Sequence, residues 1–339
     1  MTELIRRLSL LRGVSGDEGA VAQAIMEEIK TCCDYSIDNL GNIIAFKKGK
    51  KPAPKKLMLA AHMDEVGFIV TYITEKGFLR FAAVGGIDGR VVAGKAVLVG
   101  KKAVYGVIGE RATHMVESTD KDKVPETEAL FIDIGAGSRE EAEKMVSVGD
   151  RAVYASDFAE FGEGFIKGRA LDDRAGCAVL IELIKSELLY DTYFAFTVQE
   201  ETGTVGAKAA AFAVKPDISL VIEATTAADI AGVPKDRQVC RLGAGAVIGF
   251  MDRATVYDST LYNIALDTAK KCGIAAQSKE GVFGGNDSRS IQSSCAGVRC
   301  LAVSMPCRYL HSPSCVLKIS DIEATFALAK ELCTEVYNA

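Results

Sequence analysis

The sequence predicts an α/β protein, with a sheet that helices cover on both faces, that carries a small all-β insertion. Continuous apolar segments at residues 57–61, 192–198 and 218–224 are typical of strands buried on both faces. Helical patterns lie between these segments, as in sheets that helices cover on both sides. Residues 67–162 differ, because they are rich in Val and Gly and hold short β segments joined by turns.

The first 66 residues are expected to begin the main domain. Val21, Ile25 and Ile29 recur four residues apart, which predicts a helix, and Ser15 is a candidate for its N-cap. The apolar strand at residues 57–61 follows this helix.

Alternating helices and strands resume after residue 163. Helices are expected at residues 173–187 and 259–272, the second of them ended by Gly273. Ser320 with Glu323 forms a capping-box pattern that would open the last helix. We therefore expect one α/β domain made of residues 1–66 and 163–339.

The insertion, residues 67–162, is expected to form a β-barrel-like module. Its single helical pattern starts at Ser138, with Glu141 completing a capping box. It contains none of the candidate ligands described below, so assembly explains it better than chemistry. The sequence thus predicts a homo-oligomer in which this module makes the contact.

Composition excludes several classes of partner. The chain has 339 residues, of which 40 are basic and 45 acidic, and it lacks the basic runs expected of a nucleic-acid-binding protein. It has no apolar stretch of about 18 residues that would cross a membrane, and its start does not resemble a signal peptide. The ten cysteines are scattered without a C-x-x-C motif. We therefore expect a cytoplasmic protein that binds neither nucleic acid nor membranes, with buried, reduced cysteines.

Potential metal ligands occur where the predicted strands end. Ligands of open α/β sheets bind at the carboxyl ends of the strands, so residues distant in sequence meet there. A further strand is predicted at residues 298–305. The candidates at strand ends are His62, Glu200, Glu201, Glu223 and, shortly after this last strand, His311.

Two further carboxylates, Asp172 and Asp173, lie where the helix at residues 173–187 opens. Imidazole and carboxylate without thiolate suit zinc, cobalt or manganese. A carboxylate between two His-plus-carboxylate half-sites could bridge two divalent ions about 3.5–4 Å apart. Cys307 and Cys315 flank His311, but their spacing matches no zinc pattern.

The adjacent pair Glu200 and Glu201 suggests two different roles. Successive residues of an extended segment point in opposite directions, so one carboxylate could bind metal while the other faces a water molecule. Asp64 lies two residues after His62 and could orient its ring by accepting the other imidazole N–H.

Each of these residues also has an ordinary structural explanation. A single histidine is more often a satisfied core residue than a ligand, and an Asp-Asp-Arg sequence usually caps a helix. Their joint occurrence favours a site, because two of the three histidines lie with the acidic clusters at strand ends. The third, His114, lies in the insertion and is expected to be structural.

Six segments carry a resemblance to a known family: "AAHMDEVGF", "GRALDDRAG", "TVQEETGTVGA", "IEATTAADIAG", "GGNDSRSI" and "RYLHSP". Together they resemble the dinuclear-metal aminopeptidases of the glutamyl and tetrahedral aminopeptidase family, some members of which have been labelled endoglucanases. The resemblance runs from near the N-terminus to the C-terminal helix. It implies a metallopeptidase-type α/β/α sandwich with a mixed central sheet, an inserted β module that mediates dimerisation, and further assembly into tetrahedral dodecamers.

The resemblance also implies a role for each candidate. His62 and His311 would each hold one of two divalent ions, zinc first, with cobalt or manganese as alternatives. Asp172 would bridge the two ions and be joined to Asp173 by an unusual peptide bond. The remaining roles are metal ligation by Glu201 and Glu223, general base catalysis by Glu200, and orientation of the imidazole by Asp64.

The sequence departs from the family pattern at two places. Position 223 is Glu where many relatives have Asp, and "GGNDSRSI" replaces the commoner "GGTDAGAI", which bears on Asp287 as a substrate-facing residue.

The leading hypothesis is a metal-dependent aminopeptidase acting on peptides. A deacylase or carboxypeptidase on the same scaffold is the first alternative, with Arg174, Arg289 and Arg308 as candidates for binding a carboxylate. A glycoside hydrolase is disfavoured because the chain has no Trp and 7% aromatic residues. A non-catalytic peptide- or metal-binding protein would not need both Glu200 and Glu201.

Overall fold

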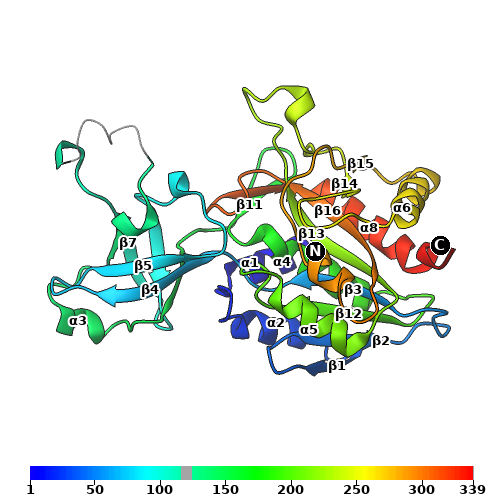
Figure 1. Cartoon of the computed structure of the whole chain (residues 1–339), viewed down its shortest axis with the longest axis horizontal. Coiled ribbons are helices and arrows are strands. Elements are labelled where there is room, and N and C mark those ends of the chain that lie inside the picture. The colour runs from blue at the N-terminus through cyan, green and yellow to red at the C-terminus, as the bar shows by residue number, and fades with distance from the viewer. Residues whose placement is uncertain (116–123, 339) are drawn as a thin grey trace.

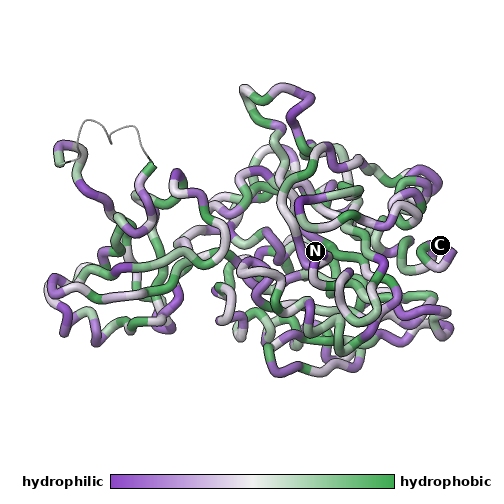
Figure 2. Tube along the Cα trace, in the orientation of Figure 1, coloured by the Kyte–Doolittle hydropathy of each residue, from purple (hydrophilic) through white to green (hydrophobic). Residues whose placement is uncertain are grey.

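The computed structural model describes residues 1–115 and 124–338. Figure 1 shows a large α/β part, on the right, and a smaller all-β part beside it, on the left. The hydropathy trace in Figure 2 shows apolar residues along the central strands and hydrophilic residues mostly in the outer loops and turns.

A mixed eight-stranded sheet forms the centre of the large part. Its central strands β12, β3, β13 and β16 are parallel, and every residue of β3 is buried. In sheet order the strands are β1 (Asp34–Ile37), β2 (Ile43–Lys47), β12 (Thr192–Thr197), β3 (Leu57–His62), β13 (Ile218–Thr226), β16 (Arg299–Cys307), β14 (Ala246–Ile248) and β15 (Ala276–Ser278).

Helices cover both faces of this sheet. One face packs against α4 (Leu171–Lys185) and α8 (Ile319–Glu335), beside α1 (Thr2–Leu10), α2 (Gly19–Ile29) and α6 (Ser259–Cys272). The other face packs against α5 (Val205–Val214) and α7 (Ser288–Gln292). The predicted α/β/α sandwich with a mixed sheet is therefore confirmed.

Two of the predicted helix boundaries are confirmed in detail. Gly273 ends α6 in the left-handed conformation, with φ of 66°, which glycine adopts without steric cost. Ser138 caps α3 (Arg139–Glu143) by accepting a hydrogen bond from the backbone N–H of Glu141.

The other two predicted caps are wrong. Ser15 does not cap α2, which follows Glu18, because its hydroxyl donates instead to the buried carboxylate of Asp64, 2.6 Å away. Ser320 lies inside α8, since strand β17 (Cys315–Lys318) runs directly into the helix and leaves no residue between them to act as a cap.

Six strands of the smaller part form a closed barrel with its own core. Phe68 packs edge-on against Phe81 and Tyr154, with ring centroids 5.1 and 5.3 Å away. In barrel order the strands are β4 (Gly67–Ile73), β5 (Leu79–Val84), β8 (Phe131–Asp133), β7 (Val104–Gly109), β6 (Ala96–Val99) and β9 (Arg151–Tyr154).

A three-stranded sheet lies after the barrel in the chain. Strand β10 (Ala159–Phe161) pairs with β11 (Phe165–Gly168), which pairs with β17. The division at residues 66/67 and 162/163 stays a prediction. Short 3₁₀ helices complete the described chain at Gly89–Val91, Thr113–Met115, Thr127–Ala129, Lys235–Arg237 and Val336–Asn338.

Within residues 1–115 and 124–338, no helix combines the length and apolar character that crossing a membrane requires.

The two central strands β3 and β13 separate at their carboxyl ends. Their pairing stops at Val221 with Ala60, whereas β13 stays paired with β16 as far as Thr226 with Cys307. Beyond Val221, side chains of β3 and β13 therefore face a gap in the sheet, and the candidate site lies at this gap.

Candidate metal centre

The first half of the centre is built around His62, the last residue of β3. Its Nε2 lies 3.2 Å from Oδ1 of Asp172 and 3.5 Å from Oε1 of Glu223. Glu223 lies within β13, so the expectation that it follows the strand is wrong. It reaches His62 because β13 continues along β16 after leaving β3.

The second half is built around His311, in the loop after β16. Its Nε2 lies 3.2 Å from Oδ2 of Asp172 and 3.2 Å from Oε1 of Glu201. The two carboxylate oxygens of Asp172 thus face different imidazoles. This is the arrangement expected of a carboxylate that bridges two ions.

Both imidazoles leave Nε2 free to bind a metal. Nδ1 of His62 lies 3.1 Å from the backbone oxygen of Asp64 and 3.3 Å from its Oδ1. Nδ1 of His311 lies 2.6 Å from the backbone oxygen of Gly86, in the insertion. Because a carbonyl oxygen can only accept, each Nδ1 carries a proton, and Nε2 is the nitrogen that faces the carboxylates and can bind a metal once it is deprotonated.

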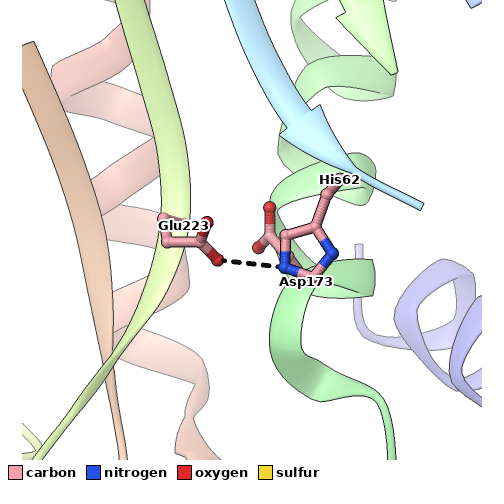
Figure 3. A group of neighbouring side chains, drawn as sticks. All are labelled: His62, Asp173 and Glu223. Carbon is pink, nitrogen blue, oxygen red and sulfur yellow. Dashed lines mark ion pairs between the residues drawn. The ribbon is translucent and has the colours of Figure 1, made fainter. Parts of the chain in front are cut away.

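Asp173 is a candidate ligand that sequence reasoning did not assign. A cis peptide bond joins it to Asp172, and its side chain is buried. One oxygen accepts from the backbone N–H of Gly176, while the other has no partner among the described residues. Figure 3 shows Asp173 close to His62 and Glu223, and ligand atoms of the three lie within 4.8 Å of one another. The sequence feature that could have indicated this role is the position of Asp173 directly after Asp172.

Glu200 and Glu201 lie in a turn after β12. The prediction of an extended segment is wrong here, because the backbone oxygen of Glu200 accepts hydrogen bonds from Gly203 and Thr204 and closes the turn. Glu201 nonetheless contacts His311, whereas Glu200 forms no ion pair within the described chain and lines the same cavity. The two carboxylates therefore differ in their surroundings.

Asp64 connects the first imidazole to this turn. Its carboxylate accepts from the backbone N–H groups of Glu200 and Glu201, at 3.0 and 3.1 Å, and lies beside Nδ1 of His62. Burial alone would raise the pKa of Asp64, but His62 and Ser15 hold it below its usual value. Asp64 therefore stays ionised and fixes the relative positions of His62 and Glu200.

The electrostatics of the cluster favour bound cations. Burial, with repulsion from Asp172, raises the pKa of Glu223 to about 8. Burial likewise raises the pKa of Glu200 and of Asp173 well above their usual values. For His62, burial alone would lower the pKa, but Glu223, Asp172 and Asp64 raise it well above its usual range.

Crowded buried carboxylates are costly unless positive charge compensates them. In the described chain two imidazoles lie among five carboxylates, those of Asp172, Asp173, Glu200, Glu201 and Glu223. One oxygen of Asp173 has no hydrogen-bond partner. Nitrogen and oxygen donors without sulfur suit zinc, cobalt or manganese. The residues therefore fit a divalent metal centre.

The arginines that were candidates for binding a substrate carboxylate lie outside this cluster. Arg174 is fully buried and donates to backbone oxygens of Met63 and Leu8, so it cannot bind a substrate carboxylate. Arg308 is paired through two nitrogens with Asp229.

The remaining positions that sequence reasoning singled out do not line the cavity, as far as the described residues show. Arg289 is exposed, and Asp287 is buried and accepts from Thr197 at 2.5 Å. Cys307 and Cys315 are buried with their sulfurs directed at backbone oxygens. His114 is exposed in the insertion.

A cavity of about 170 Å³ opens directly onto the cluster. The acidic and imidazole groups form one part of its wall. The rest includes backbone and side-chain atoms of Thr225, Val239, Lys279, Phe283 and Asn286.

An α/β/α sandwich with imidazoles and carboxylates at the carboxyl ends of its strands defines a metal-dependent hydrolase of the metallopeptidase class. The model of the M42 glutamyl aminopeptidase family matches residues 41–328, and the chain belongs to that family. The predicted family of metal-dependent aminopeptidases is thereby confirmed.

Relatives match over almost their whole length. A protein of Acetivibrio thermocellus that carries an aminopeptidase name is 41% identical in an alignment of 338 residues that covers 98% of each chain. The lysyl aminopeptidase of Pyrococcus furiosus is 32% identical and is covered over 97% of its length by 98% of this chain.

Solved structures share the whole fold, including the barrel. The aminopeptidase of the archaeon Desulfurococcus kamchatkensis superposes with a TM-score of 0.92 at 35% identity, covering 98% of this chain and 96% of that one. The Pyrococcus horikoshii TET1 peptidase, which can assemble into a tetrahedron or a large octahedral shell, has a TM-score of 0.86 at 35% identity, with 98% and 99% covered.

Proposed function

We propose that this protein removes amino acids from the free N-terminus of peptides at a dinuclear metal centre. The observation that carries the proposal is the position of Asp172, whose two oxygens each face one of the imidazoles His62 and His311. Glu223 and Glu201 complete the two half-sites, and Asp173 is a further donor to the first.

Two bound divalent ions, zinc or else cobalt or manganese, would lower the pKa of a water molecule and polarise the scissile carbonyl. Glu200 lines the cavity without an ion-pair partner, so its carboxylate is available to accept a proton from the water and to return it to the leaving amine. Burial raises the pKa of Glu200, which strengthens it as a base. Asp64 keeps the turn that carries Glu200 next to His62.

The acidic cluster also supports recognition of an N-terminus rather than a C-terminus. A free α-amino group is a cation and is attracted to carboxylates, whereas a carboxypeptidase needs a cation placed for the terminal carboxylate. Arg174 and Arg308 are engaged elsewhere, and Arg289 does not line the cavity. The carboxypeptidase alternative therefore loses the three arginines that favoured it.

A peptide with a free amino terminus is expected to be shortened from that end, and its N-acetylated form to be cut at least about 100-fold more slowly. The acetyl group removes the positive charge that the carboxylates attract. Mass spectrometry of the products measures both rates and the order of residues released. Release of C-terminal residues, or faster loss of the acetyl group than of the first amino acid, would contradict the proposal.

We also propose that the protein is a homo-oligomer in which the insertion forms a dimer, with a tetrahedral dodecamer as the larger assembly. Tyr105 and Val107 on the outward face of β7 support this, since both are exposed apolar side chains on the barrel. The likeness to the TET1 peptidase of Pyrococcus horikoshii, which can assemble into a tetrahedron, supports the larger assembly. The cytoplasmic location stays a prediction.

Light scattering is expected to give a mass that is an even multiple of 36.1 kDa. The double change Tyr105→Asp and Val107→Asp should reduce that mass, because it places charges on the proposed contact. Ile37→Asp, at an exposed residue of β1, is the matched control and should leave the mass unchanged. A monomer in the wild-type protein at micromolar concentration would refute the assembly.

A further inference from the structure

The turn that carries Glu200 is held by side chains from three distant segments. Each of the four backbone N–H groups of residues 198–201 donates to one of these side chains. The acceptors, in the order of the donors, are Asn42 at 2.9 Å, Glu18 at 3.1 Å, and Asp64 at 3.0 and 3.1 Å. Because these N–H groups lie beyond the end of β12, the position of the turn depends on the three side chains that accept from it.

Asn42 joins the two ends of this turn. It is fully buried, and its Nδ2 donates to the backbone oxygen of Gly206 at 2.9 Å while its Oδ1 accepts from Val198. The backbone N–H of Gly206 also donates to the backbone oxygen of Val198 at 3.0 Å. A Cβ atom at position 206 would lie 2.3 Å from Oδ1 of Asn42, so this close contact requires glycine.

Glu18 holds the residue directly before Glu200. That residue, Gln199, has a positive φ of 55°, a conformation that costs a residue with a side chain roughly 1–2 kcal/mol, so its peptide would tend to relax if nothing held it. Oε1 of Glu18 accepts from the N–H of Gln199 and also from the N–H of Gly16, at 2.8 Å. The carboxylate of Glu18 thus joins the N-terminal loop to a turn that lies 181 positions away in the chain.

Glu18 does not have the usual role of a residue at a helix start. It occupies the N-cap position of α2, but its side chain makes no capping hydrogen bond to that helix. Its side chain is buried, and burial together with the charge of Asp64 raises its pKa, so placing a carboxylate here costs free energy. A buried acid that leaves its own helix uncapped and lies near another carboxylate is explained by the turn that it holds.

We propose that Glu18 is a positioning residue for the general base, and that by holding the N–H of Gln199 it keeps the carboxylate of Glu200 directed into the cavity. This inference rests on the proposed aminopeptidase function and adds a residue to it. The described residues that line the cavity do not include Glu18, so it acts through Glu200 and does not touch the substrate. A reacting group displaced by about 1 Å can lose about 100-fold in rate, so the effect is measurable.

The test uses metal-saturated protein and the unblocked aminoacyl anilide that the wild-type protein cleaves fastest. Glu18→Ala is expected to lower kcat at least about 10-fold and to change KM less than about 2-fold, because the base moves while the substrate contacts remain. Glu18→Gln keeps an oxygen that can accept from both N–H groups and should restore most of the lost turnover. Hydrogen exchange of the segment 198–206 should be faster in Glu18→Ala than in the wild-type protein.

Asp321→Ala is the matched control. Asp321 is also a buried acid that accepts from two backbone N–H groups of a loop, those of Gly243 and Gly245, and it lies outside the described lining of the cavity. This change should leave kcat and the exchange of the segment 198–206 as in the wild-type protein.

A double variant distinguishes positioning from general destabilisation. If Glu18 acts through Glu200, Glu18→Ala should lower turnover less than about 2-fold in a protein that already carries Glu200→Gln, because no base remains to be placed. Losses that multiply in the double variant, full turnover in Glu18→Ala, or failure of Glu18→Gln to restore turnover would each overturn the inference. Absence of turnover on every unblocked substrate by the wild-type protein would instead refute the aminopeptidase function, and exchange of the segment 198–206 would still measure whether Glu18 holds the turn.

Discussion

Glu200→Gln is expected to keep its bound metal and to lose at least about 100-fold in turnover, the usual contribution of general acid-base catalysis. Glu200 lines the cavity but forms no ion pair with either imidazole. The amide has nearly the same shape and cannot accept the proton. Steady-state kinetics with a free-amine peptide, together with metal analysis of the same sample, measure both effects.

Glu201→Ala is the matched control for this experiment. Its carboxylate lies 3.2 Å from Nε2 of His311 and belongs to a half-site, so its loss should lower metal content. If both variants lost metal equally, and excess metal restored both, the different roles assigned to the two neighbouring carboxylates would be wrong.

Asp172→Ala is expected to have the larger effect, with turnover reduced at least about 1,000-fold. Removing its two oxygens takes one donor from each half-site, and metal ions supply several kcal/mol of transition-state stabilisation, at 1.36 kcal/mol for each factor of ten. Metal content should fall in both half-sites. Kinetics and elemental analysis of the same preparation measure the loss of turnover and the loss of metal together.

Asp258→Asn provides the comparison for general effects of removing an aspartate. Asp258 caps α6 and pairs with Arg299. Asparagine caps a helix about as well as aspartate, so this change mainly removes the ion pair and should lower stability by about 1 kcal/mol at most while leaving metal content unaltered. A folded Asp172→Ala protein with wild-type metal content would contradict the bridging role. Circular dichroism establishes that each variant is folded before the comparison is made.

The central sheet and the approximate position of the site could be predicted because they depend on local patterns. Buried strands appear as continuous apolar runs, and the residues at their carboxyl ends must lie at one edge of the sheet. His62 and His311 are brought together in this way, with Asp172 between them. The family model matches residues 41–328, a range that includes these same residues.

Other features depend on contacts between distant segments and have no local signal. The separation of β3 from β13, which lets Glu223 reach His62 from within a strand, follows from the different lengths over which β13 pairs with its two neighbours. The backbone oxygen of Gly86, which orients His311, comes from the insertion.

The predicted N-caps of two helices were wrong for a related reason. The patterns at Ser15 and Ser320 are typical of N-caps, but in each case the tertiary structure prevents the serine from capping the helix. The Ser15 hydroxyl satisfies the buried Asp64, and β17 leads directly into α8. The contact of Glu18 with Gln199 has no local signal either, since the two residues are 181 positions apart.

Elemental analysis of the fully loaded wild-type protein tests the central claim most directly. Two half-sites that share Asp172 predict two divalent ions per chain at saturation. A dialysed sample titrated with zinc, and separately with cobalt or manganese, should reach this number with at least one of the three. Saturation at one ion per chain with every metal would contradict a dinuclear centre bridged by Asp172.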